Sequence, residues 1–257
     1  MADIFLYLII YSFLGWCCEC VYCSFGQGEW INRGFLTGPF CPIYGFGAVA
    51  TLALLQFLPS SALAVFFGGM LITSTLEYIT SWAMEKLFNA RWWDYSQRPF
   101  NIHGRVCLLN STLFGLLCLF LHFDLHPVIY KSVMFFSQDF KFGFLFAFFL
   151  YFIADLSLSI KSSLGINIRL KALVELREQI LVKYAELDAK LELSQLEEKL
   201  LTLNIRDELL EKLQKKQKDI GFFERRMMRS FPEMVNKSYP ERFEELKKSL
   251  KKKRREE

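Results

Sequence analysis

Residues 91–105 read Arg91-Trp92-Trp93-Asp94-Tyr95-Ser96-Gln97-Arg98-Pro99-Phe100-Asn101-Ile102-His103-Gly104-Arg105, a polar, aromatic and basic island between two strongly apolar segments. Because apolar segments flank this island (residues 91–105) on both sides, it must lie at a membrane surface or fold back into the interior of the protein. It holds the densest set of binding and titratable groups in the first two-thirds of the chain. We therefore expect function to be concentrated here.

The composition of the chain changes sharply near residue 160. Of the 257 residues, 53% are hydrophobic and 16% are aromatic, more than is usual in a soluble domain. Most of the 31 Lys and Arg residues follow Ile160. The sequence thus predicts a transmembrane helical domain over residues 1–160 and a charged helical tail over residues 161–257. Basic residues beside a membrane favour anionic lipids over nucleic acid as partners.

Five segments are apolar enough, at about twenty residues each, to cross the hydrocarbon as helices. They are residues 4–23, 35–58, 61–85, 106–122 and 140–160. Residues 128–136 are too short to span, so an interfacial or re-entrant piece, or a sixth span, stays open. The expected fold is an all-α, polytopic transmembrane bundle. The N-terminus lacks a signal-cleavage pattern, so we expect the first span to be retained.

Five spans place the island and the tail on the same side of the membrane. Basic residues favour the cytoplasmic side, so we expect a cytoplasmic tail. From about residue 165 to 220, leucines recur at three- and four-residue steps with charges on other faces. This pattern predicts a long helix and leaves open a helical hairpin or a dimeric coiled coil, and with it a homo-oligomer.

Four carboxylates lie within the expected spans, namely Glu19, Glu77, Glu85 and Asp155. Such groups face a bundle interior or a water-filled path, so we treat them as candidates for a substrate, proton or cation pathway. The alternative is that they pair with Arg33, Arg91 or Arg105 and join helices together. The second span opens with Gly38, Pro39, Pro42 and Gly45, which predicts a broken helix of the kind that transporters use at their sites.

The island offers a second kind of site. Its aromatic residues could form an interfacial belt. Alternatively, its polar residues could bind an anionic headgroup or substrate through forked arginine hydrogen bonds. The candidates are Asp94, Tyr95, Arg98, Asn101, His103 and Arg105. We expect no metal and no cofactor: Cys17, Cys18, Cys20 and Cys23 point in several directions on one helix, and there is no phosphate-binding loop.

Three stretches together resemble the putative ABC-transporter type IV family, the CmpB-like bacterial integral membrane proteins. They are Gly15-Trp16 with Glu19, the run from Gly38 to Gly45, and Trp93-Asp94-Tyr95-Ser96 followed by Pro99, Asn101 and Gly104. The resemblance covers roughly residues 5–160. It implies a multi-pass protein of the bacterial cytoplasmic membrane and favours a role in transport.

The leading hypothesis is a transporter or permease component, with Glu19, Glu77 and Asp155 lining its interior. ATP-driven transport would need a separate cytosolic ATPase, because the chain has no nucleotide-binding motif of its own. A second hypothesis is a membrane-embedded enzyme acting on a lipid or lipid-linked substrate, in which Asp94 or His103 is the general acid or base and Arg98 or Arg105 holds a phosphate. A third is a membrane-anchored helical scaffold for a cytosolic partner.

Overall fold

The computed structural model describes the chain except for residues 29, 58–60, 191–220 and 257. The chain forms two compact units. The first contains residues 1–161 together with residues 229–235, and the second contains residues 162–228 and 236–257. The first unit holds the apolar helices and the island.

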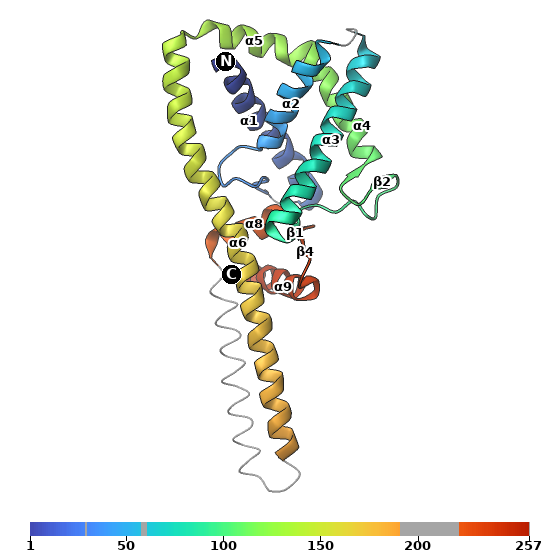
Figure 1. Ribbon diagram of the computed structural model, residues 1–257, viewed down its shortest axis with the longest axis vertical. Coiled ribbons are helices and arrows are strands. Elements are labelled where there is room, and N and C mark those ends of the chain that lie inside the picture. Colours follow the sequence, from blue (N-terminus) through green and yellow to red (C-terminus); the bar gives the residue numbers. More distant parts are fainter. Residues whose placement is uncertain (29, 58–60, 191–220, 257) are drawn as a thin grey trace. The chain divides into compact units, whose positions relative to one another are not determined.

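The first unit is built from apolar helices (Figure 1). These are α1 (Ala2–Gln27), α2 (Pro42–Leu55), α3 (Ala62–Phe88), α4 (Leu108–Phe120), the π-helical turn η1 (Leu121–Leu125), α5 (His126–Phe135) and the first part of α6 (Gln138–Lys190). Four stretches are long and apolar enough to cross a membrane, namely Ala2–Phe25, Ala62–Phe88, Leu108–Phe135 and Gln138–Leu176. In the picture α5 runs from the end of α4 to the start of α6.

The second expected span is shorter than the sequence suggested. We expected residues 35–58 to cross, but α2 has only 14 residues, about 21 Å at 1.5 Å per residue against the ~30 Å of a hydrocarbon core. Pro42 occupies the first turn of α2 and residues 31–41 are not helical. Proline is tolerated in a first turn because its missing N–H would have no partner there anyway.

Close packing at small residues holds these helices together. A Cβ on Gly45 would overlap the side chain of Ser12 and the carbonyl oxygen of Leu8, so α1 and α2 touch at backbone distance. A Cβ on Gly69 of α3 would overlap Cys118 of α4. In lipid, such contacts replace the hydrophobic driving force that packs helices in water.

The expectation of a mostly helical fold is confirmed, and the structure adds short strands at the island that the sequence did not predict. Strands β2 (Asn101–Ile102) and β3 (Val106–Cys107) pair antiparallel, and β1 (Ala90–Arg91) pairs with β4 (Val235–Asn236). The fourth apolar helix therefore begins at Leu108 rather than at Val106. Val106 and Cys107 are β-branched or small and buried, and their backbone groups are used in the ladder.

The fifth span and the tail share one helix. Helix α6 runs for 53 residues through the boundary expected near residue 160, because the single Gly165 weakens a helix without ending it. The second unit contains the later part of α6, α8 (Phe222–Ser230, except its last two residues) and α9 (Pro240–Glu256). The expected coiled-coil or hairpin pattern continues into residues 191–220, which lie outside the described residues.

Candidate functional site

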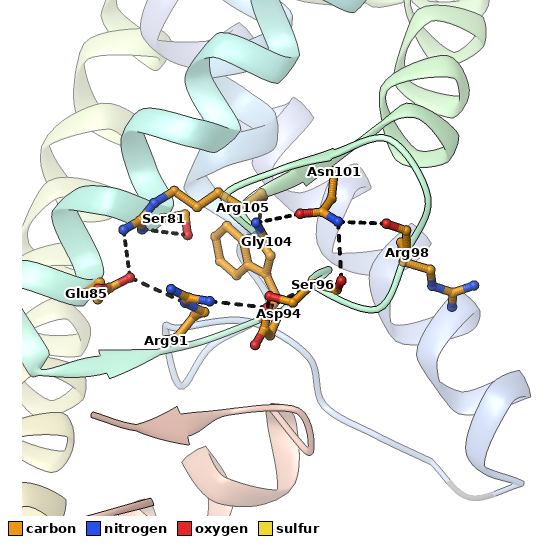
Figure 2. Close-up of polar contacts among 10 residues, drawn as sticks. Ser81, Glu85, Arg91, Asp94, Ser96, Arg98, Asn101, Gly104 and Arg105 are labelled. Carbon is orange, nitrogen blue, oxygen red and sulfur yellow. Dashed lines mark hydrogen bonds and ion pairs between the residues drawn. The ribbon is translucent and has the colours of Figure 1, made fainter. Parts of the chain in front are cut away.

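The polar residues of the island mostly hold the island itself in shape (Figure 2). The carboxylate of Asp94 accepts hydrogen bonds from the backbone N–H and the hydroxyl of Ser96. The Asn101 amide donates to the carbonyl oxygens of Arg98 and Ser96, and its oxygen accepts from the N–H of Gly104. Asp94 and Asn101 are thus used as turn-stabilising residues.

Gly104 is required by the geometry of this turn. Its φ is 67°, in the left-handed region. A Cβ there would overlap the side chains of Ser96 and Asp94. The turn can therefore bring these polar side chains against the backbone only with glycine at this position.

Charged groups anchor the island to α3. Glu85 of α3 receives the Arg105 guanidinium at 2.8 Å and the Arg91 guanidinium at 3.4 Å. Arg105 also donates to the hydroxyl of Ser81, 3.4 Å away, and Arg91 continues to Asp94 at 3.3 Å (Figure 2). Glu85 and Arg105 are both buried. For Glu85, the arginine pairing that the sequence left open is therefore the arrangement in the structure, and a buried pair of this kind is costly to break.

Two further polar candidates of the island, Arg98 and His103, are exposed. The Arg98 guanidinium points away from the cluster in Figure 2. His103 shares a hydrogen bond with the hydroxyl of Tyr78 through Nδ1, at 3.0 Å. Among the described residues, no hydrogen bond or ion pair links either of these two side chains to the Asp94 carboxylate.

The electrostatics of Asp94 also weigh against a role as general acid. Partial burial favours the protonated form, but hydrogen bonds from Ser96 and the Arg91 guanidinium outweigh it and hold the pKa of Asp94 below its usual value of 3.8. A general acid working near neutral pH needs a shift in the opposite direction.

A hydrogen bond between Tyr95 and Glu77 connects the island to α3. Tyr95 donates its phenolic hydrogen to Oε1 of Glu77 on α3, at 3.3 Å. Burial, together with the negative charges of Glu77 and Glu19, raises the pKa of Tyr95 above its usual 10, so Tyr95 remains a hydrogen-bond donor. Glu77 is only 5% exposed, and its Oε2 is buried and makes no hydrogen bond with any residue that the structure describes.

A second pair lies close to the first. Tyr44 of α2 donates to Oε1 of Glu19 on α1 at 2.7 Å, and the Arg33 guanidinium approaches Oε2 of Glu19 at 3.5 Å. The carboxylates of Glu19 and Glu77 interact electrostatically, as do Tyr95 and Arg33. We call these five residues, Glu19, Arg33, Tyr44, Glu77 and Tyr95, the inner polar cluster. It joins two carboxylates and one guanidinium.

Asp155 has a different role from the other carboxylates. It accepts the backbone N–H groups of Thr37 and Gly38, both at 2.8 Å, and the Tyr151 hydroxyl at 3.2 Å. These bonds satisfy the backbone groups that the non-helical residues 31–41 leave free at the start of α2. Asp155 is therefore a partner of the broken helix.

The four residues predicted to break the second span, Gly38, Pro39, Pro42 and Gly45, have different structural roles. Pro39 lies in the non-helical stretch, and Pro42 opens α2. Gly38 leaves room for the Tyr151 hydroxyl, and Gly45 lets α2 approach α1. No hydrogen bond or ion pair among the described residues joins these four positions to the inner polar cluster, although Gly45 adjoins Tyr44.

Sequence reasoning did not select Tyr44 and treated Arg33 only as a pairing partner. Tyr44 stands inside the Gly- and Pro-rich run, where a large polar side chain among small residues was an available signal. Arg33 is a charge next to an apolar segment, and no spacing links it to Glu19. Among the described residues, no group of three or more His, Cys, Asp or Glu side chains could hold a metal ion.

The long apolar helices define the class of this molecule as a helical membrane protein. Residues 6–160 match the family described as putative ABC-transporter type IV, and the chain belongs to that family. Comparison with curated proteins and with solved structures finds no match.

Proposed function

We propose that this protein is a transporter-like membrane component whose inner polar cluster lies on the path of a positively charged species, a proton or a small cation. Glu77 carries the proposal. A buried carboxylate oxygen without a donor is costly, and it is accounted for when the oxygen meets a proton or a cation in part of a working cycle.

The location of Glu77 supports this proposal. It lies in α3, one of the helices long enough to cross a membrane, and the discontinuous start of α2 is close by through Tyr44. Transporters commonly place their sites beside such interrupted helices. Family membership adds to the case for transport, because the family description names a transporter type.

A flux assay in proteoliposomes tests the proposal. Purified protein is reconstituted in vesicles under an imposed potassium diffusion potential, with a pH-sensitive dye inside to report protons or a sodium-sensitive dye inside to report sodium supplied outside. We expect charge-dependent flux that falls to the level of protein-free vesicles in Glu77→Gln and is strongly reduced in Glu19→Gln.

The control is Glu178→Gln, which removes one exposed carboxylate outside the cluster. This variant should transport like the unaltered protein. Flux that is unchanged in both Glu77→Gln and Glu19→Gln would exclude the carboxylate path. An unaltered protein indistinguishable from empty vesicles with every ion would exclude the proposed class of substrate.

The proposal includes a location and a partner. We place the protein in the bacterial cell membrane with the island and the tail on the cytoplasmic side, where Arg91, Arg98 and Arg105 follow the preference for basic residues. A separate cytosolic ATPase would supply energy for ATP-driven transport. A mild-detergent pull-down from native membranes tests this partner: a stoichiometric ATPase supports it, and its loss on truncation before Gly165 assigns docking to the tail.

A further inference from the structure

A short segment of the tail belongs to the membrane unit. Residues 229–235 lie far beyond the family-matched residues 6–160, yet they fall in the same compact unit as residues 1–161. We call residues 229–235 the clasp segment. Its Phe231 and Met234 side chains are buried.

The clasp segment contacts the non-helical stretch that precedes α2. The Arg33 guanidinium donates from Nη1 to the carbonyl oxygen of Ser230 at 2.6 Å, and the Ser230 hydroxyl donates to the carbonyl oxygen of Asn32 at 2.5 Å. The same guanidinium lies over the Phe231 ring, 4.6 Å from its centroid. Arginine can make these contacts at the same time because its planar guanidinium group has several N–H donors at its edge and a flat face that can lie on an aromatic ring.

The clasp segment also contacts the island. Phe231 packs edge-on against Trp92 with 4.8 Å between ring centroids, and Trp92 is only 1% exposed. Phe35 and Phe88 pack on the same indole. The segment thus completes an aromatic cluster between the island and the end of α3.

Arg33 connects the clasp segment to the inner polar cluster. Its Nε lies 3.5 Å from Oε2 of Glu19, whereas its Nη1 bonds to Ser230. One guanidinium is therefore held between a carboxylate of the cluster and the backbone of the tail. Without Ser230 and Phe231, Arg33 would lose two of the groups that fix its position beside Glu19.

One feature of the contact between the clasp segment and Trp92 favours release of the segment. The indole nitrogen of Trp92 is buried and makes no hydrogen bond with any residue that the structure describes. A buried donor without an acceptor opposes the closed state. If Phe231, one of the rings that pack on Trp92, moved away, water could reach the indole N–H. The hydrogen bond to that water would offset part of the packing energy that is lost.

We infer that the clasp segment is an intrachain regulatory ligand that positions Arg33 against Glu19. When it is bound, Arg33 neutralises Glu19; when it is released, Arg33 can leave and the cluster gains net negative charge. The effect on cation flux rests on the proposed function, whereas the positioning of Arg33 does not. The tail could thus report its own conformation, or the binding of a partner, to the membrane site.

Hydrogen exchange on the full-length protein in lipid nanodiscs tests the contact. The informative amide is that of Arg33, whose N–H donates to Sγ of the buried Cys20. In Phe231→Ala we expect residues 31–34 to exchange about fivefold faster or more, the factor that the loss of an aromatic pair and a cation–π contact would produce. Glu233→Gln alters an exposed side chain of the same segment and should leave exchange unchanged.

A second variant guards against misfolding of Phe231→Ala. Arg33→Lys keeps the positive charge but cannot reproduce the fork, so exchange at residues 31–34 should rise while the Phe231 ring remains. Unchanged exchange in both variants would overturn the inference.

The flux assay then separates regulation from function. In a transporting protein, Phe231→Ala should raise cation flux severalfold and Glu233→Gln should not. Faster exchange with unaltered flux would overturn regulation but leave the proposed function standing. If the unaltered protein transports no cation, the proposed function fails and the exchange result alone decides whether the clasp segment positions Arg33.

Discussion

At the scale of single residues, the buried carboxylates differ in their hydrogen-bond and ion-pair partners. Glu85 meets two guanidinium groups, and Asp155 meets two backbone N–H groups and a phenol. Glu77 has one phenolic donor and one oxygen without a partner among the described residues. Of these three carboxylates, Glu77 is the one with an oxygen that a proton or a cation could still bind, which is why Glu77 and not Asp155 carries the functional proposal.

The pKa of Asp94 predicts an acid-dependent loss of stability in the island. Because this pKa is lowered in the folded protein, the ionised carboxylate stabilises the fold above the usual value of 3.8, and the stabilisation is lost as the pH falls through the lower folded value. Asp94→Asn should lower the melting temperature at neutral pH, by an amount corresponding to about 1 kcal/mol. The difference between the two proteins should shrink as the solution is acidified.

Thermal unfolding in detergent between neutral pH and pH 3 measures this difference. A gap in melting temperature that stays constant over that range would show that the charge of Asp94 does not contribute. The exposed Glu233→Gln is the control and should show no gap.

Gly38 predicts a steric effect at the broken helix. A Cβ at this position would overlap the Tyr151 hydroxyl and crowd the Asp155 carboxylate. Gly38→Ala should therefore destabilise the protein by about 1–3 kcal/mol, the usual range for overpacking. Gly143→Ala is a matched control, because a Cβ there meets nothing within 4 Å.

Thermal unfolding again gives the result. Tyr151→Phe in the Gly38→Ala background removes the overlapping oxygen and should restore part of the stability. Equal melting temperatures for Gly38→Ala and Gly143→Ala would contradict the geometry.

At the scale of elements, α1 organises both ends of the membrane unit. Its first turns hold Asp3, which pairs with the buried Lys141 of α6 at 2.7 Å, and Tyr11, which bonds to His126 of α5 at 2.8 Å. Its last turns hold Glu19 of the inner polar cluster. Between them, Gly15 and Ser12 face α2, so the close α1–α2 contact sets where Tyr44 meets Glu19.

The packing of α2 on α1 can be tested within one helix. Gly45→Ala places a methyl group against the Leu8 carbonyl oxygen, which is backbone and cannot turn aside. The helices should separate, and the neighbouring Tyr44 should lose its bond to Glu19. We expect lower thermal stability together with impaired cation flux.

Gly47→Ala adds the same methyl group two residues later, where the nearest atom is 3.9 Å away on Thr73. It should behave like the unaltered protein in both assays. If the two variants were equally stable and equally active, α1 and α2 would not be in backbone contact at Gly45.

At the scale of the whole molecule, the orientation proposed above predicts which positions face the same solution. Arg98 lies in the exposed island, and Ser137 lies in the exposed connection between α5 and α6. One stretch that is long and apolar enough to cross a membrane, Leu108–Phe135, separates them in the chain. The proposed orientation therefore places them on opposite sides of the membrane, with Arg98 in the cytoplasm.

Cysteine labelling measures this directly. A membrane-impermeant maleimide added to intact cells should label Ser137→Cys and not Arg98→Cys, and inverted vesicles should give the reverse. Quantifying each cysteine separately by mass spectrometry removes the contribution of the native cysteines. Labelling of both positions from one side would exclude a single crossing between Arg98 and Ser137.

The sequence alone was sufficient for the class of protein. Runs of apolar residues of membrane length, and a charged tail after them, predict membrane helices because each backbone group in lipid must be satisfied within a helix. The family could also be recognised from Gly15-Trp16, the Gly38–Gly45 run and Trp93-Asp94-Tyr95-Ser96. These are local features, and each is visible within about twenty residues of chain.

Only the tertiary structure decided which polar residues meet. Nothing in their spacing predicts that Glu19 meets Tyr44, that Tyr95 meets Glu77, or that Ser230 meets Arg33, because the two residues of each contact belong to different segments of the chain. Asp94 and Asn101 were candidates for binding a ligand, and only the structure shows that both also hydrogen-bond to the backbone of the island. The sequence shows which polar groups need a hydrogen-bond partner, but the partner is supplied by whichever group lies next to them in the folded protein. The composition of this chain therefore determined that it is a membrane protein, and its packing determined that one carboxylate oxygen of Glu77 has no hydrogen-bond partner among the described residues.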